Sequence, residues 1–122
     1  MPDTITPAAL LDEPLLLGLL AEVPATVVTG VLPLIDAGIA HLAARLGDLS
    51  SAGAEPAARA AHSLAGAAST VGLRWTAQRA RETETALRRG EAARAAAITD
   101  EIVRTHPTAI AALNGFLAGR VA

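Results

Sequence analysis

One histidine, His62, lies in a stretch of small residues, 61–73, whose spacing predicts a helix. Imidazole suits nucleophilic chemistry near neutral pH, because its neutral form keeps a free lone pair on one ring nitrogen. At 100° per residue, the apolar Leu64 falls on the side of the helix opposite His62. The residues within about 60° of His62 are Glu55, Ala58, Arg59, Ala65, Gly66 and Ser69. We therefore expect an exposed histidine that another protein can reach.

Gly66 supports this interpretation. A glycine inside a helix is about 1 kcal/mol less favourable than an alanine. Close packing against a second helix would explain it, but Gly66 lies on the predicted solvent face, one turn beyond His62. We favour the alternative that a Cβ at this position would block a partner from reaching the imidazole.

The rest of the composition excludes several other kinds of site. The chain has no cysteine, so it has no disulfide or thiolate metal site, and its three histidines lack metal-ligand spacing. Ser63 lies on a predicted helix and not on the strand-to-helix turn of a hydrolase nucleophile. No glycine-rich loop could hold the phosphates of a nucleotide. The net charge of −2 gives no basic surface for nucleic acid.

The composition favours an all-α domain. Alanine, the best helix former, is abundant, whereas runs of β-branched residues are short. The longest apolar run, residues 23–35, contains two prolines and is shorter than the roughly 20 residues that a bilayer span needs. The N-terminal residues lack the basic segment of a signal peptide. We expect a cytoplasmic protein with no membrane partner.

Apolar residues recur at helical spacing over four long stretches. The predicted core helices are at about 25–49, 55–71, 74–89 and 91–117, with a turn at 50–53. An apolar helical region precedes them at about 7–21, with Thr6 as its N-cap and with Pro14 dividing or kinking it. Pro33 should kink the second helical stretch or delay its regular start, and a kink is expected near Pro107. Because the connections are short, consecutive helices should be antiparallel. We predict a single domain over residues 1–122, an antiparallel up-down-up-down four-helix bundle with an extra N-terminal covering helix.

The residues around His62 also carry a resemblance to a known family. His62, Leu64 and Gly66, followed by Gly72 and Leu73, resemble the signature H-x-L-K-G-x-x-x-x-x-G of histidine-containing phosphotransfer (HPt) domains. The resemblance extends over nearly the whole chain. It implies a helical bundle whose exposed histidine exchanges phosphoryl groups with aspartates of receiver domains in two-component phosphorelays.

On this resemblance, the chain is a phosphorelay intermediate that carries a phosphoryl group on His62. It would pass the group between the receiver domains of a hybrid histidine kinase and of a response regulator. The implied protein is a monomeric carrier and not a true enzyme. It has no metal site or cofactor of its own, and Mg²⁺ is expected on the partner receiver domain.

The chain departs from the signature at one position, where the lysine of the family is Ala65. That lysine steadies the phosphoryl group, and the chain has no lysine anywhere to replace it. Arg59, one turn before His62 on the same face, is the first candidate for the missing cation. Arg74 and Arg81 on the next helix are further candidates. The predicted phosphate or partner contacts are Arg59, Ala65, Gly66, Ser69 and Arg81.

The resemblance assigns a second role to Glu84. In HPt domains a Gln or Glu at this position on the following helix hydrogen-bonds the imidazole, and the Glu form resembles the phosphotransfer domain of chemotaxis histidine kinases. A carboxylate that accepts from Nδ1–H would fix the tautomer and leave Nε2 of His62 as the nucleophile. The alternative is that Glu84 only pairs with Arg88 on its own helix.

Two other functions stay open at the level of sequence. The first is a non-catalytic HPt-like module that binds and modulates a receiver or a kinase, which Ala65 in place of the lysine supports. The second is the dimeric phosphotransferase arrangement of histidine kinases. That arrangement has a proline five residues after the histidine, where this chain has Ala67, and it needs a two-helix dimer stem.

Overall fold

The computed structural model describes residues 7–120, which form helices joined by short turns, with no strand in that range. The helices are α1 (Pro7–Leu10), α2 (Glu13–Leu20), α3 (Ala25–Gly47), α4 (Leu49–Ala52), α5 (Ala54–Thr70), α6 (Arg74–Arg88) and α7 (Ala92–Ala118). Thr6, the expected N-cap of the first helix, lies outside the described residues. The four long helices begin and end close to their predicted bounds.

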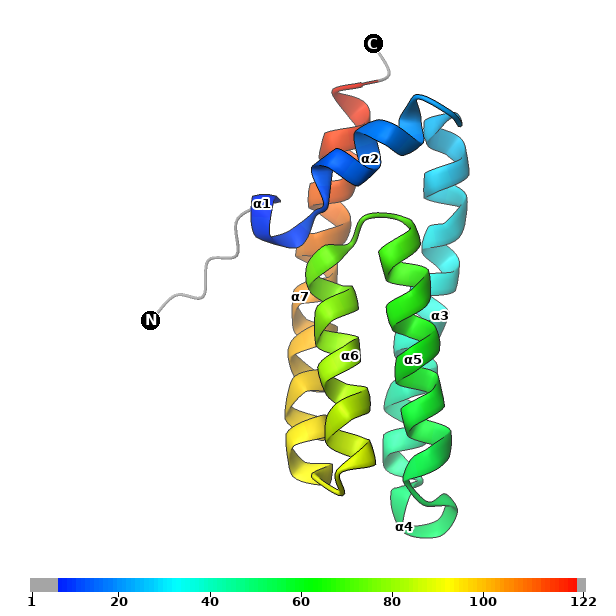
Figure 1. Cartoon of the computed structure of the whole chain (residues 1–122), viewed down its shortest axis with the longest axis vertical. Coiled ribbons are helices and arrows are strands. Elements are labelled where there is room, and N and C mark those ends of the chain that lie inside the picture. The colour runs from blue at the N-terminus through cyan, green and yellow to red at the C-terminus, as the bar shows by residue number, and fades with distance from the viewer. Residues whose placement is uncertain (1–6, 121–122) are drawn as a thin grey trace.

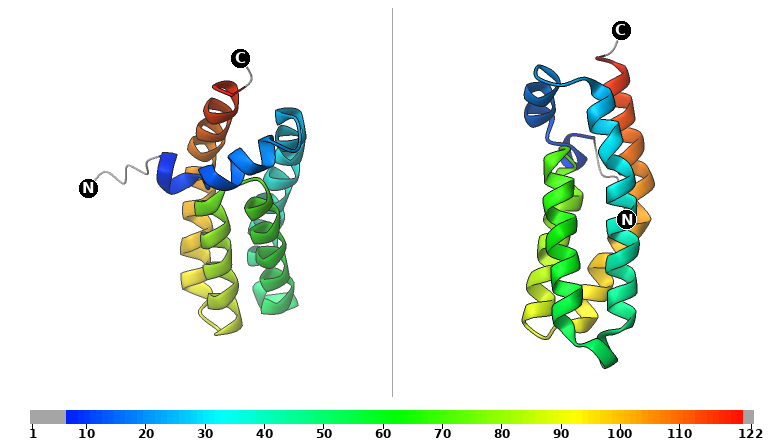
Figure 2. Two further views of the ribbon diagram at one scale, coloured as in Figure 1. Left: turned by 45° about the horizontal axis from the view of Figure 1, so that its top comes forward. Right: turned by 90° about the vertical axis from the view of Figure 1, so that its right-hand side faces the viewer.

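The four long helices α3, α5, α6 and α7 alternate in direction and form a bundle (Figure 1). Each packs against two others: α3 against α5, α5 against α6, α6 against α7, and α7 against α3. The predicted all-α bundle is confirmed. At one end, α3 and α7 extend beyond the hairpin of α5 and α6, and α2 lies across that end (Figure 2).

The N-terminal region forms two short helices, the first of the two arrangements expected around Pro14. Asp12 is the N-cap of α2, and its side chain accepts a hydrogen bond from the backbone of Leu15 at 3.2 Å. Pro14 lies in the first turn of α2, where its missing N–H has no helical partner to lose.

Two details of the long helices concern Pro33 and the turn at 50–53. Helix α3 begins at Ala25, so Pro33 does not delay its start. Pro33 and Pro107 lie inside α3 and α7, and both helices continue through them. Each proline leaves unpaired a carbonyl on an exposed residue four positions earlier, Thr29 or Val103, where water can hydrogen-bond to it. The predicted turn at 50–53 begins instead as the short helix α4, which ends at Gly53 with φ of 80°.

The turn between α5 and α6 fixes the position of α2. Gly72 has a φ of 73°, which favours glycine, and its carbonyl accepts a hydrogen bond from the backbone N–H of Asp12 at 2.8 Å. A Cβ on Gly72 would lie 2.6 Å from Cγ of Leu16, which is fully buried. The covering helix is therefore docked on the hairpin that carries His62.

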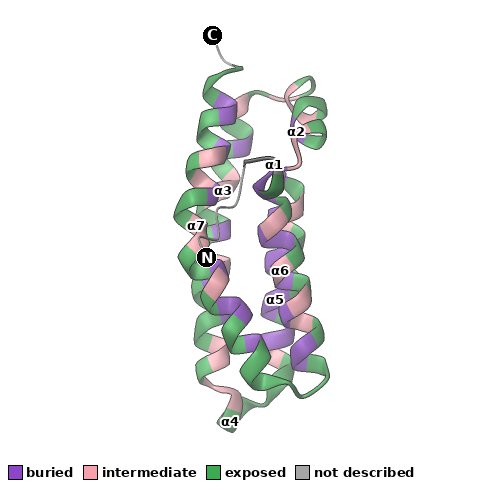
Figure 3. Ribbon diagram, turned by 90° about the vertical axis from the view of Figure 1, so that its left-hand side faces the viewer, coloured by how far each residue is buried: buried purple, intermediate pink, exposed green. Residues whose placement is uncertain are grey.

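The buried residues face the interior between the α3–α7 pair and the α5–α6 pair (Figure 3). Between α3 and α5 the approach is close, because a Cβ on Gly38 would lie only 3.3 Å from Leu64 Cδ1. On the opposite pair, Nε2 of His106 on α7 lies 2.6 Å from Oδ1 of Asp36 on α3. The Gly38–Leu64 contact thus packs α5 against α3, and the His106–Asp36 contact joins α3 to α7.

Helix α3 is long and apolar enough, by length and composition alone, to cross a membrane, with a mean hydropathy of 1.7 over its most apolar window. A core helix of a bundle can have the same composition. Four residues of α3 are buried in the bundle: Val28, Ile35, Ile39 and Leu42. Its outward side includes the exposed Val27 and Leu34.

Candidate functional site

His62 lies near the middle of α5, and its side chain is 75% exposed. The opposite side of the helix is packed, and Leu64 is fully buried there. The exposed face is narrower than the helical projection predicts, because Ala58 and Ala65 are also buried. Helix α6 packs against α5 along this side and covers both alanines. The imidazole therefore stands at the edge of the α5–α6 contact.

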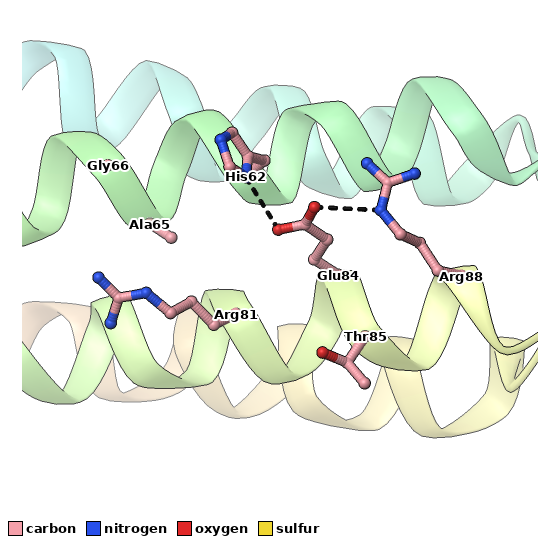
Figure 4. A pocket seen from close by; sticks show the side chains of 7 residues that line it. All are labelled: His62, Ala65, Gly66, Arg81, Glu84, Thr85 and Arg88. Atoms are coloured by element: carbon pink, nitrogen blue, oxygen red, sulfur yellow. Dashed lines mark hydrogen bonds and ion pairs between the residues drawn. The ribbon is translucent and has the colours of Figure 1, made fainter.

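Glu84 on α6 lies beside the imidazole (Figure 4). Its Oε1 is 3.1 Å from Nδ1 of His62, which is the contact that the resemblance to HPt domains implies. Its Oε2 accepts a hydrogen bond from Nε of Arg88 at 3.1 Å. The two interpretations of Glu84 are therefore not exclusive, because each carboxylate oxygen serves one partner.

The charge state of Glu84 decides which ring nitrogen is available. Burial alone would raise the pKa of Glu84, but the hydrogen bonds and charges of His62 and Arg88 outweigh it and lower the pKa below 4.5. Glu84 is thus ionised at neutral pH and can only accept hydrogen bonds. The hydrogen of the contact must then lie on Nδ1 of His62. In the neutral imidazole this leaves the lone pair on Nε2, which faces away from Glu84.

Arg88 connects this pair to a row of alternating charges. Its Nη1 donates to Oε1 of Glu55 at 2.7 Å, and these two carboxylate partners raise the pKa of Arg88 further. Oε2 of Glu55 lies 3.8 Å from Nε of Arg59. The row places the positive charge of Arg88 next to the carboxylate oxygen of Glu84 that does not contact His62.

Arg59, the first candidate for the missing cation, lies outside the group of residues around the imidazole. The cause is the direction of helical side chains, which lean toward the N-terminus of their helix. A residue one turn before His62 therefore leans away from it, toward Glu55. Arg74, another candidate, pairs with Asp12 at 3.4 Å.

An open depression of about 490 Å³ lies between α5 and α6 beside the imidazole (Figure 4). Its lining residues are His62, Ala65, Gly66, Arg81, Glu84, Thr85 and Arg88. A Cβ added to Gly66 would meet no described atom within 4 Å, so this glycine is not required for packing inside the chain. The structure thus brings together five of the predicted site residues: His62, Ala65, Gly66, Arg81 and Glu84.

Ser69 lies one turn farther along α5 and does not line the depression. Its Oγ accepts a hydrogen bond from Nη2 of Arg81 at 2.6 Å. Sequence reasoning missed Thr85 and the part played by Arg88 as lining residues. Their spacing from Arg81 and Glu84 on α6 was a usable signal, because residues three or four apart share one helix face.

Among residues 7–120, no group of three or more His, Cys, Asp or Glu side chains could hold a metal ion. The chemistry of the site is instead that of one exposed nucleophile. A carboxylate fixes the orientation of the imidazole, and arginines supply positive charge nearby. Such a site can accept a phosphoryl group and release it again.

Comparison with known proteins agrees with this chemistry. The model of the Hpt domain family matches residues 34–115. The chain belongs to the Hpt domain family. Hpt domains take part in histidine phosphotransfer in two-component signalling, interact with receiver domains and are typically soluble. No curated protein and no solved structure matches the chain.

Proposed function

We propose that this Hpt domain is a phosphorelay intermediate that carries the phosphoryl group on Nε2 of His62. It would accept the group from an aspartate in the receiver domain of a hybrid histidine kinase and donate it to an aspartate of a response regulator. One observation carries the proposal: an imidazole that is 75% exposed has its other nitrogen, Nδ1, held 3.1 Å from a carboxylate.

In the accepting reaction, the lone pair on Nε2 of His62 attacks the phosphorus of an aspartyl phosphate. The N–P bond forms while the bond from phosphorus to the aspartyl oxygen breaks, and the carboxylate leaves with that electron pair. Nδ1 keeps its proton, so the phosphorylated ring has a positive charge next to Glu84. The donating reaction is the reverse, with the next aspartate as nucleophile.

Glu84 both helps and opposes this chemistry. It orients the imidazole and stabilises the positive ring, but its negative charge repels an incoming phosphoryl group. Arg88, 3.1 Å from its second oxygen, compensates part of that charge. Catalysis beyond this would come from positioning and from the partner, including the Mg²⁺ expected on the receiver domain.

The open depression and Gly66 would form the centre of the docking surface, since no described atom would lie within 4 Å of a Cβ on Gly66. A partner can therefore approach the imidazole over bare helix backbone. We place the protein in the cytoplasm, where receiver domains are found, and propose that it acts as a monomer.

The test is phosphoryl transfer from receiver domains. Receiver domains are loaded with acetyl phosphate, separated from it and mixed with the protein, and acid-labile phosphate on the protein is followed. The wild type should become labelled and His62→Gln should not. His41→Gln is the matched control, because His41 is an exposed histidine on α3 away from the site, and it should be labelled like the wild type.

The outcomes separate the proposal from the non-catalytic alternative, which Ala65 favours. Receivers that bind the protein tightly without transferring phosphate would support a module that only modulates them. Labelling of His62→Gln at the wild-type rate would place the phosphoryl group on another residue.

A further inference from the structure

A phosphoryl group on His62 would add a dianion close to the carboxylate of Glu84, on a surface open to water. Such a charge needs a cation within reach, as in other sites that handle phosphoryl groups. Position 65 cannot supply it, because the side chain of Ala65 ends at Cβ. The remaining question is which arginine does so.

Three of the nearby arginines already face carboxylates. Arg59 lies 3.8 Å from Glu55, and Arg74 lies 3.4 Å from Asp12. Arg88 pairs with both Glu84 and Glu55. Their positive charges are largely compensated within the chain.

Arg81 differs from these three. Among residues 7–120, its one polar partner is the neutral hydroxyl of Ser69, at 2.6 Å. A hydroxyl satisfies a donor but leaves the charge of the guanidinium uncompensated. Arg81 is also one of the residues that line the depression beside His62.

The antiparallel packing of α5 and α6 places Arg81 at the right level. Glu84 lies opposite His62, so Arg81, one turn earlier on α6, lies opposite Ala65, one turn later on α5. Figure 4 shows the side chain of Arg81 extending toward Ala65 and Gly66, and all three residues line the depression. The small residue at position 65 leaves space for the guanidinium.

We propose that Arg81 is the phosphate-binding cation of this site. Its guanidinium would exchange the Ser69 hydroxyl for oxygens of a phosphoryl group on His62, which its planar fork of donors fits well. This rests on the proposed phosphorylation of His62. If Arg81 supplies the positive charge that binds the phosphoryl group, a lysine at position 65 should be able to supply that charge when Arg81 is absent.

Potassium phosphoramidate, a small donor of phosphoryl groups to imidazole, tests this without a receiver domain. The initial rate of phosphate uptake on His62 is measured for the wild type and for Arg81→Ala. Loss of a charged hydrogen bond at an exposed site should slow uptake about tenfold. Arg94→Ala is the matched control, because Arg94 is exposed on α7 and does not line the depression, and its uptake should be unchanged.

Two rescue variants distinguish a charge from a structural effect. Arg81→Ala combined with Ala65→Lys should recover most of the lost rate, because a lysine can extend from this covered position into the depression. Arg81→Lys keeps the charge but loses the planar fork, so its rate should lie between those of Arg81→Ala and the wild type. Equal uptake by the wild type and Arg81→Ala would overturn the proposal, as would a loss that neither variant restores. If the wild type takes up no phosphate on His62, both this proposal and the proposed function are wrong.

Discussion

Glu84 lies beside Nδ1 of His62 and so favours the tautomer in which Nδ1 carries the hydrogen. Its carboxylate stays ionised because His62 and Arg88 lower its pKa more than burial raises it. An ionised carboxylate beside Nδ1 selects one tautomer and one nucleophilic nitrogen. The same shift in pKa connects the site to the stability of the fold.

Replacing this carboxylate with an amide gives the first prediction at the residue scale. Glu84→Gln keeps the shape but loses the charge that stabilises the phosphorylated ring. We expect phosphoryl uptake on His62 to slow by roughly tenfold, the effect of losing one charge-assisted hydrogen bond. The measurement is uptake from a phosphorylated receiver domain, with Glu82→Gln, on the same helix but outside the depression, as the control.

The same variant predicts a pH dependence. A carboxyl whose pKa is lowered in the folded state binds fewer protons there than when unfolded, so it stabilises the fold above the unfolded pKa, near 4.5. This contribution is lost as the pH falls through the lower, folded pKa. Urea unfolding at pH 7 and pH 3 should therefore show a stability gap between wild type and Glu84→Gln that narrows in acid. A gap that widens in acid would contradict the pairing.

The contacts of individual side chains were harder to predict from the sequence than the helices were. His62 and Glu84 could be placed from spacing and from the resemblance. Arg59 lies beside Glu55 and does not line the depression, because a helical projection gives the angle of a side chain but not its lean toward the N-terminus. Arg81 and Arg88 could be ranked only when their partners on other helices were known, since Glu55 and Ser69 decide how their charges are used.

At the scale of elements, α5 is packed on its inner side but has a glycine, Gly66, that faces open space on its outer side. Ala60, Leu64 and Ala68 are buried on its inner side. Gly66 faces open space, so no contact within the chain explains why it is not alanine. A glycine here makes the helix less stable than an alanine would and gains no packing contact within the chain. We infer that a partner protein needs the space that a Cβ would occupy.

Gly66→Ala should therefore separate stability from function. The fold should become more stable by about 0.5–1 kcal/mol, because alanine is the better helix former and meets no neighbour. Transfer from a receiver domain should become slower, because the new methyl group lies on the surface that the partner approaches. Thermal melting and transfer kinetics measure the two effects.

Gly18→Ala provides the comparison for this experiment, since Gly18 also meets no atom within 4 Å but lies on α2, away from the depression. It should leave transfer unchanged. A Gly66→Ala protein that transfers phosphate at the wild-type rate would show that the glycine does not serve docking.

The helices themselves were predictable, and their contacts were less so. Apolar periodicity placed the four long helices close to their observed bounds. The burial of Ala58 and Ala65 was missed because the projection treats α5 as a separate cylinder, whereas α6 covers part of its exposed face. The pattern of one helix does not report how far a neighbour wraps around it.

At the scale of the molecule, α3, α5, α6 and α7 complete a four-helix bundle within one chain. The dimeric histidine-kinase arrangement needs a second chain to complete its bundle, and this fold removes that need. The site itself lies on the single hairpin of α5 and α6, while α3 and α7 support it from the other side. This division leaves the His62 face free for a partner.

We propose that His62 carries the phosphoryl group on Nε2, the nitrogen that does not face Glu84. Phosphorus NMR of the phosphorylated protein, with ¹⁵N-labelled histidine, identifies the nitrogen through its coupling to phosphorus. We expect one phosphohistidine, on Nε2 of His62, and none in His62→Gln. A phosphoryl group on Nδ1, or on any other residue, would contradict it.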